Sequence, residues 1–101
     1  MNRGEVWWAY DEVGGRPYLV LTRDAVIPLL TRVVAVPLTR TARGIPSELP
    51  LGPDDGLPEP CVATFDNVTS MPKRRFRERI CTLPPTRMRD VCRALRIAVD
   101  C

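Results

Sequence analysis

The sequence predicts a small, mostly antiparallel β barrel that is followed by one C-terminal helix. Several short segments are rich in β-branched and aromatic residues, and turns containing proline or glycine separate them. Helical spacing of apolar residues is confined to the last part of the chain. Since strands do not alternate with helices, an antiparallel barrel of about five short strands is favoured over a parallel sheet.

Three strands are expected in the first half of the chain. They cover Glu5 to Tyr10, Pro17 to Thr22 and Val33 to Thr39, with a two-glycine turn at 11–15 and a helical turn or loop at 24–30. The third strand shows no polar alternation, so cover on both faces is expected. The barrel core would cover one face, and a second subunit would cover the other.

The second half is expected to contain shorter strands and the helix. Residues 40–60 predict an irregular excursion with a short strand from Ser47 to Leu51, and further strands cover Cys61 to Phe65 and Phe76 to Leu83. A polar corner, 66–71, joins the last two. After Pro84 and Pro85, an amphipathic helix is expected to bury an apolar face made of Met88, Val91, Cys92, Leu95, Ala98 and Val99.

Length and composition indicate one domain over residues 1–101. The chain has 101 residues, of which 45% are hydrophobic, so it can build a single core. A domain of this size gains from covering an apolar face with another subunit, which favours a homodimer. We expect a cytoplasmic protein, because the sequence shows neither a secretory leader nor an apolar run of membrane-spanning length.

The charge is modest overall but unevenly distributed. The net charge is +3, yet residues 73–96 hold nine basic side chains against two acidic ones, whereas residues 53–66 contain only acidic charges. Fourteen of the fifteen basic residues are arginines, whose planar guanidinium suits phosphate. The run from Lys73 to Arg79 could follow RNA phosphates, receive an acidic protein tail or be a solvated edge.

The residues available for metal chemistry are few. The chain has no histidine, and its four cysteines, Cys61, Cys81, Cys92 and Cys101, include no close pair. A zinc site of the usual Cys/His spacing is therefore excluded. Reduced thiols that act as small apolar side chains are the favoured interpretation.

Four segments in register form a recognisable pattern: Arg3-Gly4-Glu5-Val6-Trp7-Trp8-Ala9, Gly15-Arg16-Pro17-Tyr18-Leu19-Val20-Leu21, Val34-Ala35-Val36-Pro37-Leu38-Thr39 and Asp66-Asn67-Val68-Thr69-Ser70-Met71. Together they resemble the MazF/PemK/Kid family of toxin ribonucleases. The resemblance spans almost the whole chain. It implies an SH3-like barrel with a C-terminal helix, of the type shared with CcdB-like plasmid toxins. It also implies a homodimer that cuts single-stranded RNA without metal or other cofactor and is neutralised by a cognate antitoxin.

By position, the resemblance places the catalytic pair of the family on Arg16 and Thr39. Their chemistry is suitable, because a guanidinium can hold two oxygens of a phosphorane and a hydroxyl can contact phosphate or the 2′-oxygen. An arginine is a poor proton shuttle, so charge stabilisation is favoured for Arg16. The general base is left open among Glu5, Glu48 and Asp66, or hydroxide from solvent.

Other residues are candidates for RNA contact. Strand alternation predicts that Trp8 is in the core and that Trp7 faces RNA or the second subunit. The remaining candidates for RNA binding are Gly15, Arg40, Asp66, Asn67, Thr69, Ser70, Lys73 and Arg74.

Three hypotheses for function follow. The first is a metal-independent, sequence-specific endoribonuclease toxin that inhibits translation and growth. The second is a non-catalytic gyrase poison on the same fold, which the C-terminal Ala98-Val99-Asp100-Cys101 disfavours because the poisons rely on a tryptophan-containing tail. The third is a non-catalytic RNA-binding barrel.

Overall fold

The computed structural model describes residues 1–101 and contains seven strands and one α-helix. The strands and the helix are β1 (Glu5–Tyr10), β2 (Gly15–Val20), β3 (Arg32–Thr39), β4 (Glu48–Leu51), β5 (Cys61–Thr64), β6 (Thr69–Pro72), β7 (Phe76–Thr82) and α1 (Pro85–Val99). A short 3-10 helix, Ile27–Leu29, lies in the segment expected to be a turn or loop. α1 is shorter and more polar than a membrane-spanning helix.

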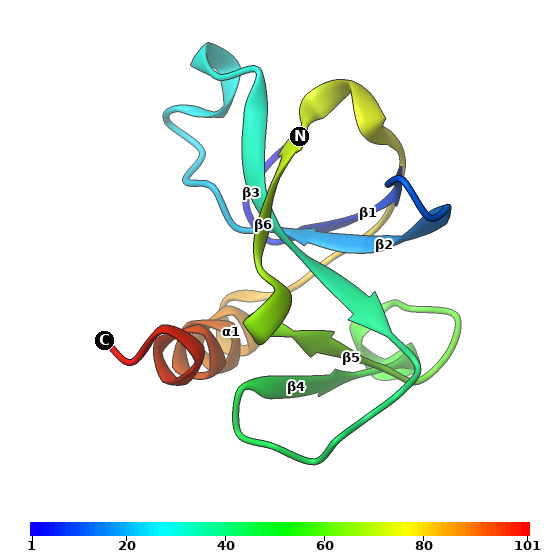
Figure 1. Cartoon of the computed structure of the whole chain (residues 1–101), viewed down its shortest axis with the longest axis vertical. Helices are drawn as coiled ribbons and strands as arrows, with labels where there is room; N and C mark the ends of the chain where they lie inside the picture. Colours follow the sequence, from blue (N-terminus) through cyan, green and yellow to red (C-terminus); the bar gives the residue numbers. More distant parts are fainter.

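The strands form one bent antiparallel sheet. Its order is β4-β5-β3-β2-β1-β7, and β6 pairs with β3 outside this path. β3 is the long strand that crosses the molecule in Figure 1; its first half pairs with β6 and its last two residues pair with β5. The expected architecture, a small antiparallel barrel with a C-terminal helix, is confirmed.

Two core clusters lie on opposite faces of the bent sheet. The first includes Leu19, Val36 and Phe65 and is completed by α1, and the second includes Val20 and Val33. Neighbouring β3 residues therefore point into different clusters. The expectation that a second subunit covers one face of β3 is wrong for most of the strand, since the same chain covers both faces. Val34, with 45% of its surface exposed, is the one apolar residue of β3 that remains uncovered.

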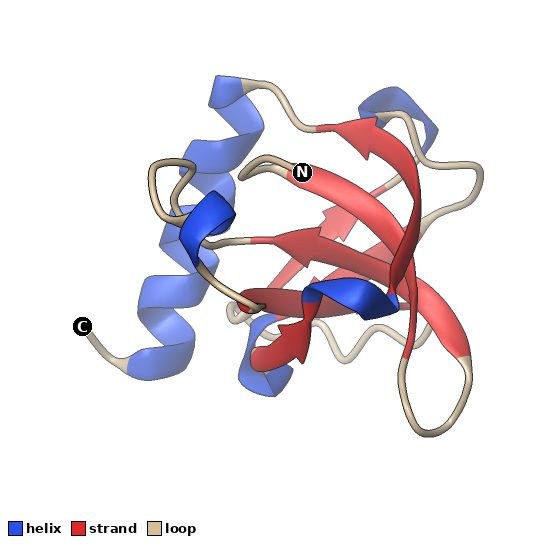
Figure 2. Cartoon of the chain, turned by 90° about the horizontal axis from the view of Figure 1, so that it is seen from above, coloured by secondary structure: helices blue, strands red, loops and turns tan.

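The helix α1 packs against β4 and the 3-10 helix Phe65–Asn67. Figure 2 shows it running along one side of the strands. Val91 and Ala94 are its buried residues. Val99, expected on the buried face, is half-exposed because the last turn extends beyond the core, whereas Ala94, which lies outside the expected face, is buried.

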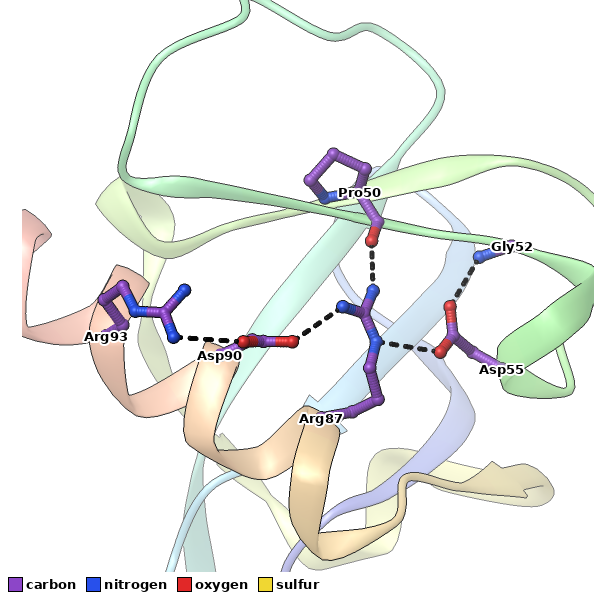
Figure 3. Close-up of polar contacts among 6 residues, drawn as sticks. All are labelled: Pro50, Gly52, Asp55, Arg87, Asp90 and Arg93. Carbon is purple, nitrogen blue, oxygen red and sulfur yellow. Dashed lines mark hydrogen bonds and ion pairs between the residues drawn. The ribbon is translucent and has the colours of Figure 1, made fainter.

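Arg87 anchors α1 to the segment that follows β4 (Figure 3). Its Nε is 2.9 Å from Asp55 Oδ1, its Nη1 is 2.8 Å from Asp90 Oδ2, and its Nη2 donates to the carbonyl of Pro50 at 2.6 Å. Asp55 Oδ2 in turn accepts from the backbone N–H of Gly52. One arginine therefore joins the first turn of the helix to β4 and to the 3-10 helix Pro53–Asp55.

β2 and the corner at 66–71 differ most from the expected strands, and the other strand boundaries agree within one residue. The corner at 66–71 contains a strand, β6, whose residues pair with the first half of β3. β2 begins at Gly15 instead of Pro17, because Gly15 pairs with Tyr10 and extends the hairpin, and it ends at Val20 instead of Thr22. The short polar segment of β6 lacks apolar alternation, so only its pairing partner reveals it.

Candidate functional site

Two cavities meet at Arg16 and Thr39. The larger has a volume of about 440 Å³, and its lining includes Trp8, Leu38 and Leu57. The smaller has a volume of about 120 Å³ and no apolar residue in its lining, which consists of Arg16, Thr39, Thr41, Arg43, Glu48, Thr64 and Asn67. Arg16 and Thr39 line both cavities, so the structure brings together the two residues expected to be catalytic.

Arg16 lies on β2 and is oriented by Asp11. Its Nε is 3.2 Å from Asp11 Oδ2, which also accepts a 2.7 Å hydrogen bond from the hydroxyl of Tyr18. Asp11 Oδ1 accepts from the backbone N–H groups of Val13 and Gly14, which closes the turn between β1 and β2. The two terminal nitrogens of Arg16 have no protein partner and can contact a ligand.

The hydrogen bonds of this cluster shift two pKa values. The Tyr18 hydroxyl is the largest influence on the pKa of Asp11, which lies below its usual range with help from the two backbone N–H groups and Arg16. Burial, together with the hydrogen bond to Asp11, raises the pKa of Tyr18 to about 12. Asp11 is therefore a carboxylate and Tyr18 a neutral donor, which keeps the charged partner of Arg16 in place.

Thr39 is the last residue of β3 and faces the smaller cavity. Its Oγ1 accepts a hydrogen bond of 3.3 Å from the backbone N–H of Thr41, so the hydroxyl proton remains available for a ligand. On the neighbouring strand, its register partner is Val62. A β-branched residue that ends a strand in this way presents a fixed hydroxyl at the junction of the two cavities.

The register of β4 and β5 explains why polar side chains gather in the smaller cavity. Glu48 pairs with Thr64, so their side chains lie on the same face of the sheet, and the pairing of Thr39 with Val62 puts Thr39 on that face as well. The alternate residues, Leu38 and Ala63, belong to the first core cluster on the other face. The cavity is thus lined by the polar face of a three-strand ladder.

Glu48 is buried beside Arg16 and Thr39 and is held by the loop that precedes it. Its Oε1 accepts from the backbone N–H groups of Arg43 at 2.9 Å and Gly44 at 3.1 Å. Its Oε2 makes no hydrogen bond within the protein. This arrangement fixes the carboxylate and leaves one oxygen free to accept a proton.

The other two candidate bases lie outside this cavity. Glu5 accepts from the backbone of Asn2 and from Trp7 Nε1, and it pairs with Arg79 at 3.3 Å. Burial raises the pKa of Glu5, but these hydrogen bonds outweigh it and the pKa is lowered. Asp66 accepts a hydrogen bond from Ser47. Among the three candidates, Glu48 alone lies in the cavity with Arg16 and Thr39.

The expectation for the two tryptophans is wrong. Trp8 is 37% exposed and lines the larger cavity, whereas Trp7 packs against the second core cluster. Val6 and Trp8 do share a face, but the first core cluster ends at Val6, so Trp8 extends past it. The indole lies against Gly15, where a Cβ would come within 2.6 Å of Trp8 Nε1. Gly15 therefore makes room for the tryptophan.

The remaining RNA-binding candidates separate into three groups. Arg40 lines the larger cavity, where it pairs with Glu59, and Asn67 lines the smaller one. Ser70, Thr69 and Arg74 line a separate groove of about 450 Å³ together with Arg32, which donates to the Ser70 hydroxyl at 2.9 Å. Lys73 donates to the carbonyl of Ile27 at 2.9 Å, so it connects two loops of the fold.

Much of the basic charge at 73–96 takes part in internal contacts. Arg79 pairs with Glu5, Arg93 pairs with Asp90, and Arg87 is the helix anchor described above. The segment does not form one uniform cationic surface. The separate groove instead combines Arg32, Arg74 and Arg75 with Asp11 and Glu12.

Residues that the sequence did not indicate complete the site. They are Trp8, Asp11, Thr41, Arg43 and Thr64. Asp11 could have been identified by its place five residues before Arg16 in a tight hairpin. Nothing in the sequence marks Thr64 as a site residue, because threonine is common inside strands.

Comparison with known proteins agrees with the fold. Residues 2–99 match the profile of the family described as PemK-like, MazF-like toxin of type II toxin-antitoxin system. The probable endoribonuclease MazF2 of Mycobacterium tuberculosis strain H37Rv is 46% identical over 102 residues, with all of both chains covered.

Two solved structures have the same fold. The Mycobacterium tuberculosis toxin MazF-mt6 superposes with a TM-score of 0.89 at 32% identity, covering 95% of this chain and 96% of its own. An endoribonuclease in complex with its cognate antitoxin, from a mycobacterial species, superposes with a TM-score of 0.88 at 29% identity, covering 99% of this chain and 95% of its own.

The barrel, the helix and the paired cavities define a class of small toxin proteins, and the chain belongs to the PemK-like, MazF-like toxin family of type II toxin–antitoxin systems. Its relatives are named endoribonucleases, which confirms the enzyme class expected in the first of the three hypotheses.

Proposed function

We propose that this protein cleaves single-stranded RNA at the junction of the two cavities, by attack of a ribose 2′-hydroxyl on the adjacent phosphate. One observation carries the proposal: the same small cavity is lined by Arg16, whose terminal nitrogens are free, by the hydroxyl of Thr39 and by the carboxylate of Glu48. These are the groups that such a reaction requires, namely an anion-stabilising cation, a hydrogen-bond donor and a base.

Each side chain has one part in the reaction. Glu48 Oε2 accepts the 2′-hydroxyl proton as the oxygen attacks phosphorus, and the bond to the 5′-oxygen breaks. The products are a 2′,3′-cyclic phosphate and a 5′-hydroxyl, which takes its proton from water. The terminal nitrogens of Arg16 hold the non-bridging oxygens, where negative charge accumulates, and Thr39 donates to the same phosphate.

The larger cavity is suited to a nucleobase. Trp8 offers an aromatic ring beside Arg16, and Pro17, Pro58 and Pro60 also line this cavity. Stacking on an aromatic ring tolerates every base, so sequence preference has to come from the polar rim, which includes Arg40 and Glu59.

The family supports a proposal for the partners and the cellular role of the protein. One relative was solved in complex with its cognate antitoxin, and we propose that an antitoxin likewise neutralises this chain. The protein would act as a homodimer in the cytoplasm, where its RNA substrate is found, and would stop translation and growth.

The proposal is tested by incubating the purified protein with end-labelled single-stranded RNAs of varied sequence in EDTA. We expect cleavage at short defined sequences, products that end in a 2′,3′-cyclic phosphate, and no cleavage where the nucleotide before the cut is 2′-deoxy. Intact RNA across the whole set would contradict the proposal. Products ending in a 5′-phosphate would contradict the mechanism.

The assignment of the base is tested by Glu48→Gln. Glutamine can still accept from Arg43 and Gly44, so the fold should be retained, while the single-turnover rate should fall by about 10²- to 10⁴-fold. The Glu5→Gln variant should cleave RNA at the wild-type rate when the two proteins are compared at equal concentrations of folded protein. A larger loss in Asp66→Asn than in Glu48→Gln would show that the base is Asp66.

A further inference from the structure

The hydroxyl of Thr64 is buried and has no hydrogen-bond partner in the protein. Thr64 is 4% exposed, and its Oγ1 is the one buried side-chain oxygen or nitrogen left unpaired in the chain. It lines the small polar cavity together with Glu48, its partner across the β4–β5 ladder. An unpaired polar atom therefore lies at the candidate catalytic centre.

A structural role does not explain this hydroxyl. Buried hydroxyl groups are almost always hydrogen-bonded, because burial removes their contact with water. Valine has nearly the same shape and stronger β propensity, so packing alone would be served at least as well without the oxygen. Glu48 Oε1 accepts from two backbone N–H groups and Thr39 Oγ1 accepts from Thr41, so neither of these atoms pairs with Thr64. The hydroxyl of Thr64 thus has a hydrogen-bonding capacity that no group of the protein uses.

The surroundings of Thr64 indicate which group of the ligand it meets. Glu48 presents a free carboxylate oxygen on the same face of the sheet, and no apolar residue lines the cavity. A ribose hydroxyl that gives its proton to Glu48 keeps two lone pairs. One lone pair must face phosphorus for attack, and the other can accept a hydrogen bond from a neighbouring donor.

We propose that Thr64 binds the attacking 2′-hydroxyl and so makes the site selective for ribose over deoxyribose. The Thr64 hydroxyl donates to the 2′-oxygen while Glu48 accepts the 2′-proton, and the two contacts together orient the nucleophile. This inference rests on the proposed ribonuclease activity and adds to it a residue that recognises the sugar. No bond is formed or broken by Thr64 itself.

The experiment compares two ligands at the mapped cleavage site. The first is the RNA substrate, whose half-saturating concentration and maximal rate are measured in single turnover. The second is the same oligonucleotide with one 2′-deoxyribose before the cut, which cannot be cleaved and is measured as a competitive inhibitor. The ratio of the inhibition constant to the half-saturating concentration reports how strongly the enzyme prefers the 2′-hydroxyl.

Removal of the hydroxyl should affect only the ligand that carries the ribose. For Thr64→Val, we expect the half-saturating concentration to rise about three- to tenfold with a lower maximal rate, while the inhibition constant of the deoxy ligand is unchanged. Thr64→Ser should keep the wild-type ratio. Thr82→Val, on an exposed strand position away from both cavities, should also keep it. The thermal midpoint of Thr64→Val should equal or exceed that of the wild type, because an unpaired hydroxyl is removed.

Three results would overturn the inference. Wild-type kinetics in Thr64→Val would show that the hydroxyl is not used, and an equal loss for both ligands would show that it contacts another group. Absence of cleavage by the wild-type protein would overturn the proposed function together with this assignment. If Thr64→Val does not fold, Thr64→Ala is judged by the same ratio.

Discussion

Arg16 shows how one residue is prepared for charge stabilisation. Asp11 holds its Nε, while the end of the guanidinium faces two cavities. A side chain fixed at one end loses less conformational freedom when it binds phosphate than a free surface arginine does. Asp11 is held in turn by Tyr18 and the backbone of the turn. The β1–β2 hairpin, which the sequence indicates only as a turn between two strands, therefore positions a candidate catalytic group.

Asp11→Asn should change the pH dependence of stability. The folded-state pKa of Asp11 is lowered, so its contribution is present above the ordinary value of about 3.9 and is lost as pH falls through the folded-state pKa. The difference in unfolding free energy between wild type and variant should therefore be larger at pH 7 than near pH 3. Urea denaturation at both pH values measures it.

A suitable control is Asp54→Asn, since Asp54 is exposed and makes no hydrogen bond or ion pair in the structure. It should leave the wild-type pH dependence unchanged. A stability difference for Asp11→Asn that is equal at both pH values would show that Asp11 does not act through its charge.

The sequence predicted only some of the individual site residues. Arg16 and Thr39 were identified by their place in four matching segments, and the structure brings them together. Trp8 was misplaced, because strand alternation gives the face of a residue but not the point at which the core ends. The unpaired state of Thr64 depends on three strands and a loop, so no local pattern could predict it.

The anchoring of α1 shows how an element far from the site supports it. Arg87 ties the helix to the carbonyl of Pro50 on β4 and to Asp55. β4 also carries Glu48, two residues before Pro50. The C-terminal helix thus fixes the strand that supplies the candidate base.

Arg87→Met should destabilise the protein by about 1 to 3 kcal/mol, because it leaves the largely buried carboxylate of Asp55 without its cation. Arg93→Met removes an ion pair whose arginine is 70% exposed and should cost less than about 0.5 kcal/mol. Urea denaturation of the two variants and the wild type provides the comparison. Equal losses in the two variants would contradict the role assigned to Arg87.

At the scale of elements, long apolar segments were predictable and short polar ones were not. The first strand was placed at the residues where it occurs, and the third differs by one residue, because consecutive β-branched and aromatic residues favour strands wherever they pack. β6 and the start of β2 depend on pairing with β3 and β1. Such strands are defined by their partners and not by their own composition.

The molecule as a whole leaves an apolar area uncovered beside β3. Leu30 is 42% exposed and Val34 is 45% exposed. Together with Val26, Val68 and Leu95 they line a groove of about 420 Å³. An apolar surface of this kind is stabilised when it is covered, and a symmetric partner is the simplest cover. We propose that the expected homodimer forms its contact here.

Val34→Glu should raise the dimer dissociation constant by at least about tenfold, because the contact would bury an unpaired charge. Sedimentation equilibrium over a range of concentrations measures the change. Ile97→Glu, at a residue of similar exposure on a different face of α1 from Leu95, is the matched control and should leave the assembly unchanged. Dissociation of the control, or wild-type assembly of Val34→Glu, would place the contact elsewhere.

The central claim is that Arg16 and Thr39 act as one catalytic pair at the junction of the two cavities, and the single-turnover cleavage rates of Arg16→Ala, Thr39→Ala and the double variant test it most directly. The account predicts a loss of about 10²- to 10³-fold for Arg16→Ala and of at least about tenfold for Thr39→Ala. The double variant should lose less than the product of the two, because both groups act on one phosphate. Cleavage at the wild-type rate by the folded double variant would contradict the account.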